Sequence, residues 1–150
     1  MRKVQRSALV PYSPRQMFAL VDDIESYPEF LPWCSDAEVH LREGDIAEAT
    51  LELHRGGIRK RFRTRNTATG SSAIDMALIG GPFKHLDGGW RFQALGDAGC
   101  KVTLDIEFEF SVAIVDRVFG TFFEDVCNRL VDAFTQRADV VYGAIGRSGG

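Results

Sequence analysis

A row of arginines is the feature with the strongest charge contrast in this sequence. Six of the eleven residues from Arg55 to Arg65 are basic and none is acidic. Strand residues two apart share a face, so four of the arginines would form a row roughly 20 Å long at ~3.4 Å per residue. They are Arg59, Arg61, Arg63 and Arg65, which we call the arginine row. Its guanidinium groups could bind the phosphates of RNA or of an anionic membrane surface. The alternative is a solvated strand face that acids partly neutralise.

Histidine, cysteine and serine residues show no pattern of a metal or catalytic site. The histidines His40, His54 and His85 lack acidic or cysteine partners at metal-ligand spacing, and no two cysteines are spaced C-x-x-C. Motifs for nucleotide binding and for a serine nucleophile are absent from the sequence. The acids within 105–109 alternate with apolar residues, so they would face away from the interior. We therefore predict a protein without enzymatic activity, metal ion or cofactor.

Alternation of apolar and polar residues predicts an antiparallel sheet between residues 35 and 110. The clearest strands are 46–54 and 100–110, and two more are expected at 73–79 and 90–95. One face of these strands is polar and the other strongly apolar, which is typical of an antiparallel sheet with one solvated side.

The glycine pair at 56–57 predicts a two-residue hairpin turn. The resulting register would set two acids opposite two arginines of the arginine row: Glu52 opposite Arg61, and Glu48 opposite Arg65. Arg59 and Arg63 would then lack a directly opposite acid. Lys60 would lie on the inward face and extend toward the rim of the interior.

Helical patterns precede and follow the sheet. After a strand at 3–10, Ser13 can begin a helix with a capping box, and this helix would end at 22–23. A short helical segment would cover 24–30, and an amphipathic helix roughly 40 Å long would cover 114–142. The predicted fold is α+β, with a curved antiparallel sheet around a long C-terminal helix and two short helices after the first strand. A twisted sheet cannot contact one helix uniformly, so we expect a gap that would hold a small apolar ligand.

Length and composition favour one globular domain. The chain has 150 residues, of which 45% are hydrophobic and 26% charged, and its net charge is −3. That charge excludes a strongly basic nucleic-acid coat, and no DNA partner is expected. We predict a single domain over residues 1–145 and a flexible tail over 146–150. Three cysteines and no secretory signal predict a cytoplasmic protein with reduced thiols, which could contact the inner membrane peripherally.

Several segments resemble one branch of the START-like (Bet v 1-like, polyketide cyclase/dehydrase-related) superfamily, and the resemblance covers about residues 1–145. They are Tyr-Pro-Glu-Phe-Leu-Pro-Trp-Cys at 27–34, Gly-Pro-Phe-Lys-His-Leu at 81–86, Gly-Trp-Arg-Phe at 89–92, Cys-Lys-Val at 100–102, Glu-Phe-Glu-Phe at 107–110 and Ala-Phe-Thr-Gln-Arg-Ala at 133–138. This branch contains mitochondrial coenzyme-Q-binding proteins and bacterial ribosome-association toxins. The resemblance implies a helix-grip fold around an apolar cavity. Mitochondrial members carry a targeting extension that this sequence lacks, so a bacterial member is expected.

The resemblance implies two candidate functions. The leading hypothesis is non-enzymatic binding of ubiquinone or a related isoprenoid lipid in the cavity, in support of respiration. The predicted ligand-binding residues are Trp33, Phe62, Met76, Leu78, Trp90, Phe92, Leu104, Ile106, Phe108, Phe119, Phe123, Val126 and Leu130. The alternative is a toxin that binds the large ribosomal subunit through the arginine row and blocks subunit joining.

The sequence allows two interpretations each for the segment 30–33 and for His85. The segment 30–33 could be a core plug under the sheet, or a lid or contact patch at the entrance of the pocket. His85 could polarise a quinone carbonyl at the cavity mouth, or it could be a surface histidine.

Overall fold

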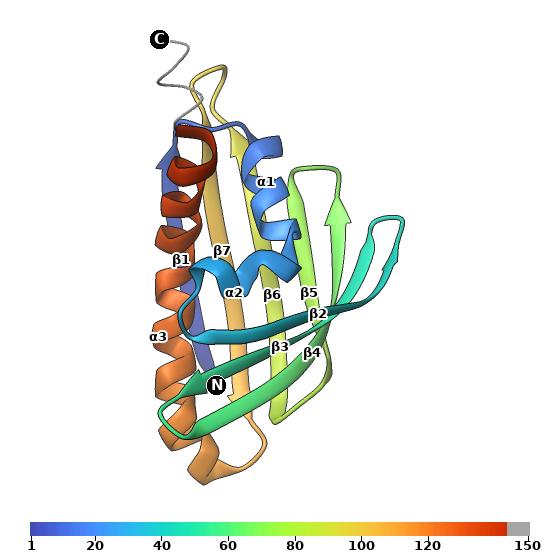
Figure 1. Cartoon of the computed structure of the whole chain (residues 1–150), viewed down its shortest axis with the longest axis vertical. Helices are drawn as coiled ribbons and strands as arrows, with labels where there is room; N and C mark the ends of the chain where they lie inside the picture. Colours follow the sequence, from blue (N-terminus) through green and yellow to red (C-terminus); the bar gives the residue numbers. More distant parts are fainter. Residues whose placement is uncertain (144–150) are drawn as a thin grey trace.

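Seven antiparallel strands form one bent sheet in the computed structural model, which describes residues 1–143 (Figure 1). The strands are β1 (Arg2–Val10), β2 (Cys34–Glu43), β3 (Ile46–Arg55), β4 (Ile58–Thr69), β5 (Ala73–Gly80), β6 (Phe83–Ala94) and β7 (Cys100–Phe110). Their order across the sheet is β1-β7-β6-β5-β4-β3-β2. Register shifts in the β2–β3, β4–β5 and β6–β7 pairs bend the sheet, because an extra residue on one strand kinks the ladder.

The helices lie on the concave side of this sheet (Figure 1). They are α1 (Pro14–Asp22), the 3-10 turn η1 (Ile24–Ser26), α2 (Tyr27–Phe30), α3 (Ala113–Ala138) and the π-helical turn η2 (Asp139–Gly143). The predicted capping box is present at Ser13 and Gln16. The final α-helix ends at Ala138 rather than at 142, because the backbone continues there as a π turn. The predicted α+β architecture, a curved antiparallel sheet with a long C-terminal helix, is confirmed.

The β3–β4 hairpin has the predicted register. Glu52 pairs with Arg61, and Glu48 pairs with Arg65. The sequence contains both determinants of this register, a two-residue turn and alternating faces, so local information was sufficient.

Strand β6 is longer than predicted. It begins at Phe83 rather than at residue 90, and it continues through Gly88 and Gly89. A Cβ atom on Gly88 would lie 2.0 Å from the Asp105 carbonyl oxygen, and the φ angle of Gly88 is +147°. Gly88 therefore permits close approach of β7, and Gly89, where a Cβ atom would lie 2.4 Å from the Ile74 carbonyl oxygen, permits close approach of β5. In the sequence the two glycines resemble a break between strands.

The core lies between α3 and the concave face of the sheet. From α3 it receives a row of aromatic and aliphatic side chains, all buried: Phe119, Phe122, Phe123, Val126, Cys127, Val131, Phe134 and Ala138. Within residues 1–143, no helix is both long enough and apolar enough to cross a membrane. The predicted tail at 146–150 lies outside the described residues, and the single-domain boundary at 145 stays a prediction.

Candidate functional site

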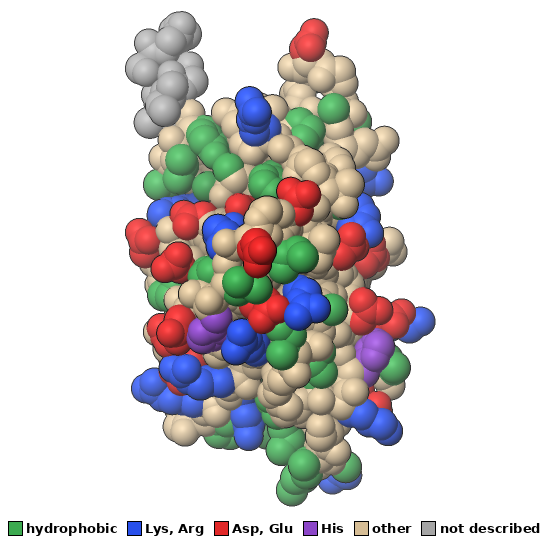
Figure 2. All heavy atoms as spheres, turned by 90° about the vertical axis from the view of Figure 1, so that its right-hand side faces the viewer, with side chains coloured by type: hydrophobic (Ala, Val, Ile, Leu, Met, Phe, Trp, Pro, Cys, Tyr) green, Lys and Arg blue, Asp and Glu red, His purple; other side chains and the backbone are tan. Residues whose placement is uncertain are grey.

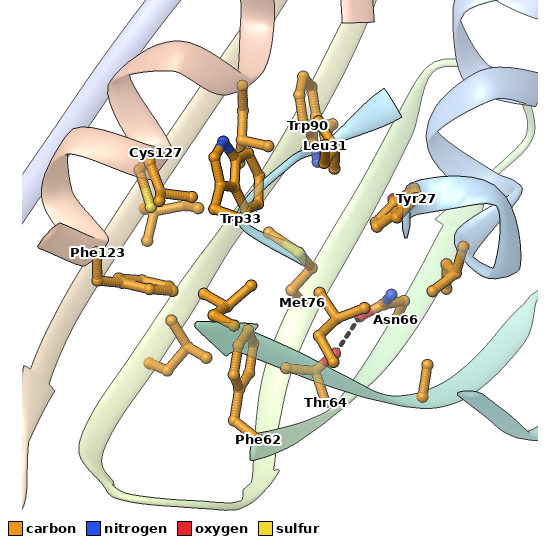
Figure 3. Close-up of a pocket in the computed structure, with 18 of the residues that line it drawn as sticks. Tyr27, Leu31, Trp33, Phe62, Thr64, Asn66, Met76, Trp90, Phe123 and Cys127 are labelled. Carbon is orange, nitrogen blue, oxygen red and sulfur yellow. Dashed lines mark hydrogen bonds between the residues drawn. The ribbon is translucent and has the colours of Figure 1, made fainter. Parts of the chain in front are cut away.

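An apolar cavity lies between α3, the α2–β2 connection and the inward face of strands β3 to β7 (Figure 3). Its volume is about 80 Å³. Inward side chains reach it from the strands because alternate residues share a face, and from α3 because residues three and four apart share a face. The space is therefore the expected gap between the bent sheet and the helix.

Eight of the thirteen predicted ligand-binding residues line this cavity. They are Trp33, Phe62, Met76, Trp90, Ile106, Phe123, Val126 and Leu130. The period-two and helical patterns gave the correct inward direction for seven of these positions, and Trp33 belongs to the 30–33 segment that was considered as a lid at the pocket entrance. Whether they bind a ligand stays a prediction.

Five predicted residues point inward but do not line the cavity: Leu78, Phe92, Leu104, Phe108 and Phe119. Leu104 and Phe108 have no exposed surface, because other core side chains cover them. Phe92 packs against Phe18 of α1, with 6.1 Å between ring centroids. Phe119 packs against Phe110 near the start of α3, at 5.6 Å. Periodicity predicts on which face of a strand or helix a residue lies, but it does not predict whether that part of the element borders the cavity.

The prediction missed twelve further lining residues: Ile24, Tyr27, Leu31, Ala49, Leu51, Leu53, Thr64, Asn66, Leu86, Asp87, Cys127 and Phe134. The alternation in β3 placed Leu51 and Leu53 on the apolar face, and the helical spacing from Val126 and Leu130 reaches Phe134. Those signals could have found these residues. Tyr27 and Ile24 lie outside any strand or long-helix pattern, so tertiary packing alone brings them in.

Few polar groups face the cavity. The Thr64 hydroxyl donates a hydrogen bond to Asn66 Oδ1 at 2.9 Å, and this pair lies across the cavity from α3 (Figure 3). The Tyr27 hydroxyl donates to the Val21 carbonyl, and burial raises the pKa of that hydroxyl. Burial also raises the pKa of the Cys127 thiol above its ordinary value. The lining can thus orient one polar group of a ligand while the remaining wall is apolar.

The 30–33 segment combines the two roles considered for it. Leu31 is 1% exposed and belongs to the core, whereas Trp33 is half-buried and forms part of the cavity wall. Because the α2–β2 connection carries both, it both plugs the core and covers the cavity.

The arginine row forms ion pairs with three acids. Arg61 contacts both Glu52 and Asp36 at 2.9 Å, and Arg65 contacts Glu48 at 2.8 Å. As predicted, Arg59 and Arg63 lie opposite His54 and Thr50 rather than opposite an acid, but both still form an ion pair. Arg59 reaches Glu52 at 3.1 Å and Arg63 reaches Glu48 at 2.9 Å, because long side chains span diagonal positions of a ladder.

These ion pairs lower the pKa values of two carboxyl groups. Hydrogen bonds from Ser35, Arg61 and Arg59 hold the pKa of Glu52 at about 2, below the ordinary 4.5. Hydrogen bonds from Arg65 and Arg63 also lower the pKa of Glu48. Folding therefore favours the ionised form of both groups.

Acid is expected to destabilise the protein through Glu52. Its pKa is lower in the folded than in the unfolded state, so the unfolded state takes up the proton first as the pH falls. Stability should decline as the pH drops from about 4.5 toward about 2. Thermal midpoints measured across this range should fall in the wild type and fall less steeply in Glu52→Gln. Glu43→Gln, at the exposed end of β2, should keep the wild-type slope, and an unchanged slope in Glu52→Gln would contradict the assignment.

Cys127 lines the cavity, whereas His85, Cys34 and Cys100 do not. His85 lies beside Glu107, with 3.8 Å between its Nε2 and the carboxylate, and it does not line the cavity. Cys34, Cys100 and Cys127 are free and buried. Among residues 1–143, no group of three or more histidines, cysteines and acids could hold a metal ion.

Comparison with known proteins identifies the family of this chain. Residues 10–135 match the family model described as polyketide cyclase / dehydrase and lipid transport. The chain belongs to this family.

An aromatase/cyclase, Zhui from Streptomyces sp. R1128, shares the fold with a TM-score of 0.82 at 15% identity, covering 92% of this chain and 93% of that one. A START superfamily protein from Mycobacterium smegmatis has a TM-score of 0.76 at 20% identity, covering 93% and 98%. The predicted START-like resemblance is confirmed.

Relatives within the family carry two kinds of name. Proteins named ribosome association toxin RatA are 44% identical in Pseudomonas aeruginosa and 46% identical in Vibrio cholerae. The matches cover 93% of this chain and 97% of the former protein, and 95% and 99% for the latter. The mitochondrial coenzyme Q-binding protein COQ10 homolog B of Xenopus laevis is 27% identical, covering 91% of this chain and 58% of that protein.

Proposed function

We propose that this chain associates with the ribosome as a toxin, binding the large subunit and blocking subunit joining. The observation that carries the proposal is 44–46% identity over nearly the full length of relatives named for ribosome association. The relative named for coenzyme Q binding is 27% identical. A cytoplasmic site of action follows from this partner.

The arginine row offers a surface for the ribosome. The Arg59 and Arg65 side chains are 66% and 56% exposed, whereas Glu52 and Glu48 beneath them are 13% and 11% exposed. The acids hold the guanidinium groups in place, and the outward N–H groups stay available for phosphate oxygens. Four arginines against three acids leave a small net positive charge, so short-range hydrogen bonds would contribute more than long-range attraction.

A double variant can test this surface without unpairing an acid. In Arg59→Gln/Arg63→Gln, Glu52 keeps Arg61 and Glu48 keeps Arg65. We expect normal folding and weaker co-sedimentation with large subunits. The plot of log affinity against log salt should become shallower by roughly 1.4–1.8, since each of the two lost phosphate contacts contributes ~0.7–0.9 to its slope.

The matched control removes two positive charges elsewhere. Arg15→Gln/Arg129→Gln changes exposed arginines on α1 and α3. It should bind subunits nearly as well as the wild type. Equal binding by all three proteins would exclude the arginine row as the contact, and absence of wild-type binding would overturn the ribosome proposal.

The apolar cavity favours a second function, the binding of ubiquinone or a related isoprenoid lipid in support of respiration. The family description includes lipid transport, and one relative is named for coenzyme Q binding. The cavity of about 80 Å³ is smaller than the ~300–1,000 Å³ of typical ligand pockets, so binding requires the Trp33 connection or α3 to move outward. The Thr64–Asn66 pair would then orient the polar head group.

Solvent extraction of the purified protein tests this second function. Mass spectrometry should find a quinone or isoprenoid lipid in near-stoichiometric amount when the producing cells make quinone. An empty protein from such cells would count against the carrier function and leave ribosome association as the single proposal.

We also propose that the chain acts without catalysis. Asp87 is the one carboxylate among the described lining residues, and it is exposed at the rim. General acid–base chemistry in the cavity would lack a paired second group. The likeness to a cyclase at 15% identity extends to the fold alone.

A further inference from the structure

One end of the molecule exposes four large aliphatic side chains. Ile58 follows the β3–β4 turn and is 45% exposed. Val112, Ile114 and Val118 lie at the start of α3 and are 55%, 66% and 57% exposed. These four residues form what we call the docking end. Figure 1 shows the β3–β4 turn and the start of α3 at the lower end of the molecule, and Figure 2 shows hydrophobic side chains at the surface of that end.

A contact between Arg55 and Phe122 connects the two elements that carry the docking end. The Arg55 guanidinium carbon lies 5.5 Å from the centroid of the Phe122 ring, so the β3–β4 turn touches α3. Ile114, Val118 and Phe122 are spaced four residues apart and form one stripe along the helix. Only the last of the three is buried, at 8% exposed. The stripe thus begins in the core and continues outward with no covering element among residues 1–143.

The residue types at the start of α3 are unfavourable for an isolated helix. Val112 occupies the N-cap, where Ser, Thr, Asp and Asn are preferred, and its side chain makes no capping hydrogen bond. A serine at this position would stabilise the start of the helix more than the exposed valine does. Helix capping therefore does not explain the exposed valine.

Basic groups surround these aliphatic side chains. Arg117 is exposed, and Lys60 is half-buried beside the turn. Neither of them, nor Arg55, forms an ion pair within the described part of the chain, in contrast to every member of the arginine row. The nearby Asp116 is engaged by Arg2 at 3.8 Å and accepts a hydrogen bond from the Phe110 N–H. The docking end is therefore positively charged as well as apolar.

We propose that the docking end binds the surface of an anionic phospholipid bilayer. Aliphatic side chains insert at the boundary of head groups and acyl chains, while flanking arginines and lysines attract the anionic head groups. An RNA surface would use the basic groups but would gain nothing from four exposed aliphatic side chains. This surface is distinct from the arginine row and from the cavity, so it does not depend on either function proposed above.

Vesicle co-sedimentation tests the proposal with the full chain. Wild-type protein should sediment with vesicles of phosphatidylglycerol and phosphatidylcholine, and at least tenfold less with phosphatidylcholine alone. Ile114→Asp/Val118→Asp should reduce binding to the anionic vesicles at least tenfold. Arg55→Gln/Arg117→Gln should reduce it by roughly fivefold per residue removed, and less at high salt.

The matched control carries the same new charges on exposed leucines outside the docking end. Leu9→Asp/Leu95→Asp alters residues that are 72% and 40% exposed. It should bind vesicles nearly as well as the wild type, apart from the small loss caused by its two added negative charges. Ile114→Ser/Val118→Ser, which adds no charge, should also bind at least fivefold more weakly than the wild type. Unchanged thermal midpoints would confirm that every variant folds.

Three outcomes would overturn the proposal. The first is no wild-type binding to anionic vesicles. The second is an equal loss of binding in the aspartate variants of the docking end and in the leucine control. The third is loss of ribosome co-sedimentation in Ile114→Asp/Val118→Asp with vesicle binding intact, which would make this end a ribosome contact.

Discussion

Phe134→Ala is expected to lower the free energy of unfolding by about 3–5 kcal/mol. Phe134 is 1% exposed. Its ring packs edge-on against Tyr27 at 5.4 Å and against Phe30 and Trp90 at 5.3 Å. Truncation would remove these contacts and leave a void, because helices and sheet on either side hold the surrounding groups in place. Urea denaturation monitored by tryptophan fluorescence measures the loss.

The same variant probes the cavity, because Phe134 lines it. The void would join the existing space of about 80 Å³. An enlarged apolar cavity can bind benzene, so benzene should recover part of the lost stability in Phe134→Ala and much less in the wild type. Phe134→Leu keeps most of the contacts and should cost roughly half as much or less. A small loss in Phe134→Ala with no effect of benzene would contradict the described packing.

Val126→Trp is expected to abolish ligand binding in the cavity. Val126 is 3% exposed and lines the cavity from α3. An indole at this position would fill the space of about 80 Å³ and resist its widening, at an overpacking cost of about 1–3 kcal/mol. Extracted lipid should fall to the background level while the protein remains folded.

A graded series controls for nonspecific damage. Bound lipid should decline from the wild type through Val126→Leu and Val126→Phe to Val126→Trp, in order of side-chain volume. Co-sedimentation with ribosomes should not change, because the arginine row lies on the outer face of β4. Retention of lipid in Val126→Trp would place the ligand elsewhere, and parallel loss of both activities would indicate one shared site. Leu104→Trp cannot replace this test, because Leu104 does not line the cavity.

The sequence by itself determined the features that depend on neighbouring residues. The capping box at Ser13 and the register of the β3–β4 hairpin follow from residue types a few positions apart. The inward direction of Phe62 and Val126 follows from the periods of strand and helix. These features could be predicted because backbone geometry and turn chemistry act over short distances along the chain.

Tertiary structure alone decided which inward residues meet the cavity and which ion pairs form. Val126 lines the cavity and Leu104 does not, because the bulges and twist of the sheet determine where it separates from α3. Arg63 reaches Glu48 diagonally, which a list of directly opposite partners cannot show. Gly88 lies inside β6 at a point where the adjacent strand β7 approaches too closely for a Cβ atom. In each case the deciding contact joins segments far apart in sequence, and only the packed chain brings them together.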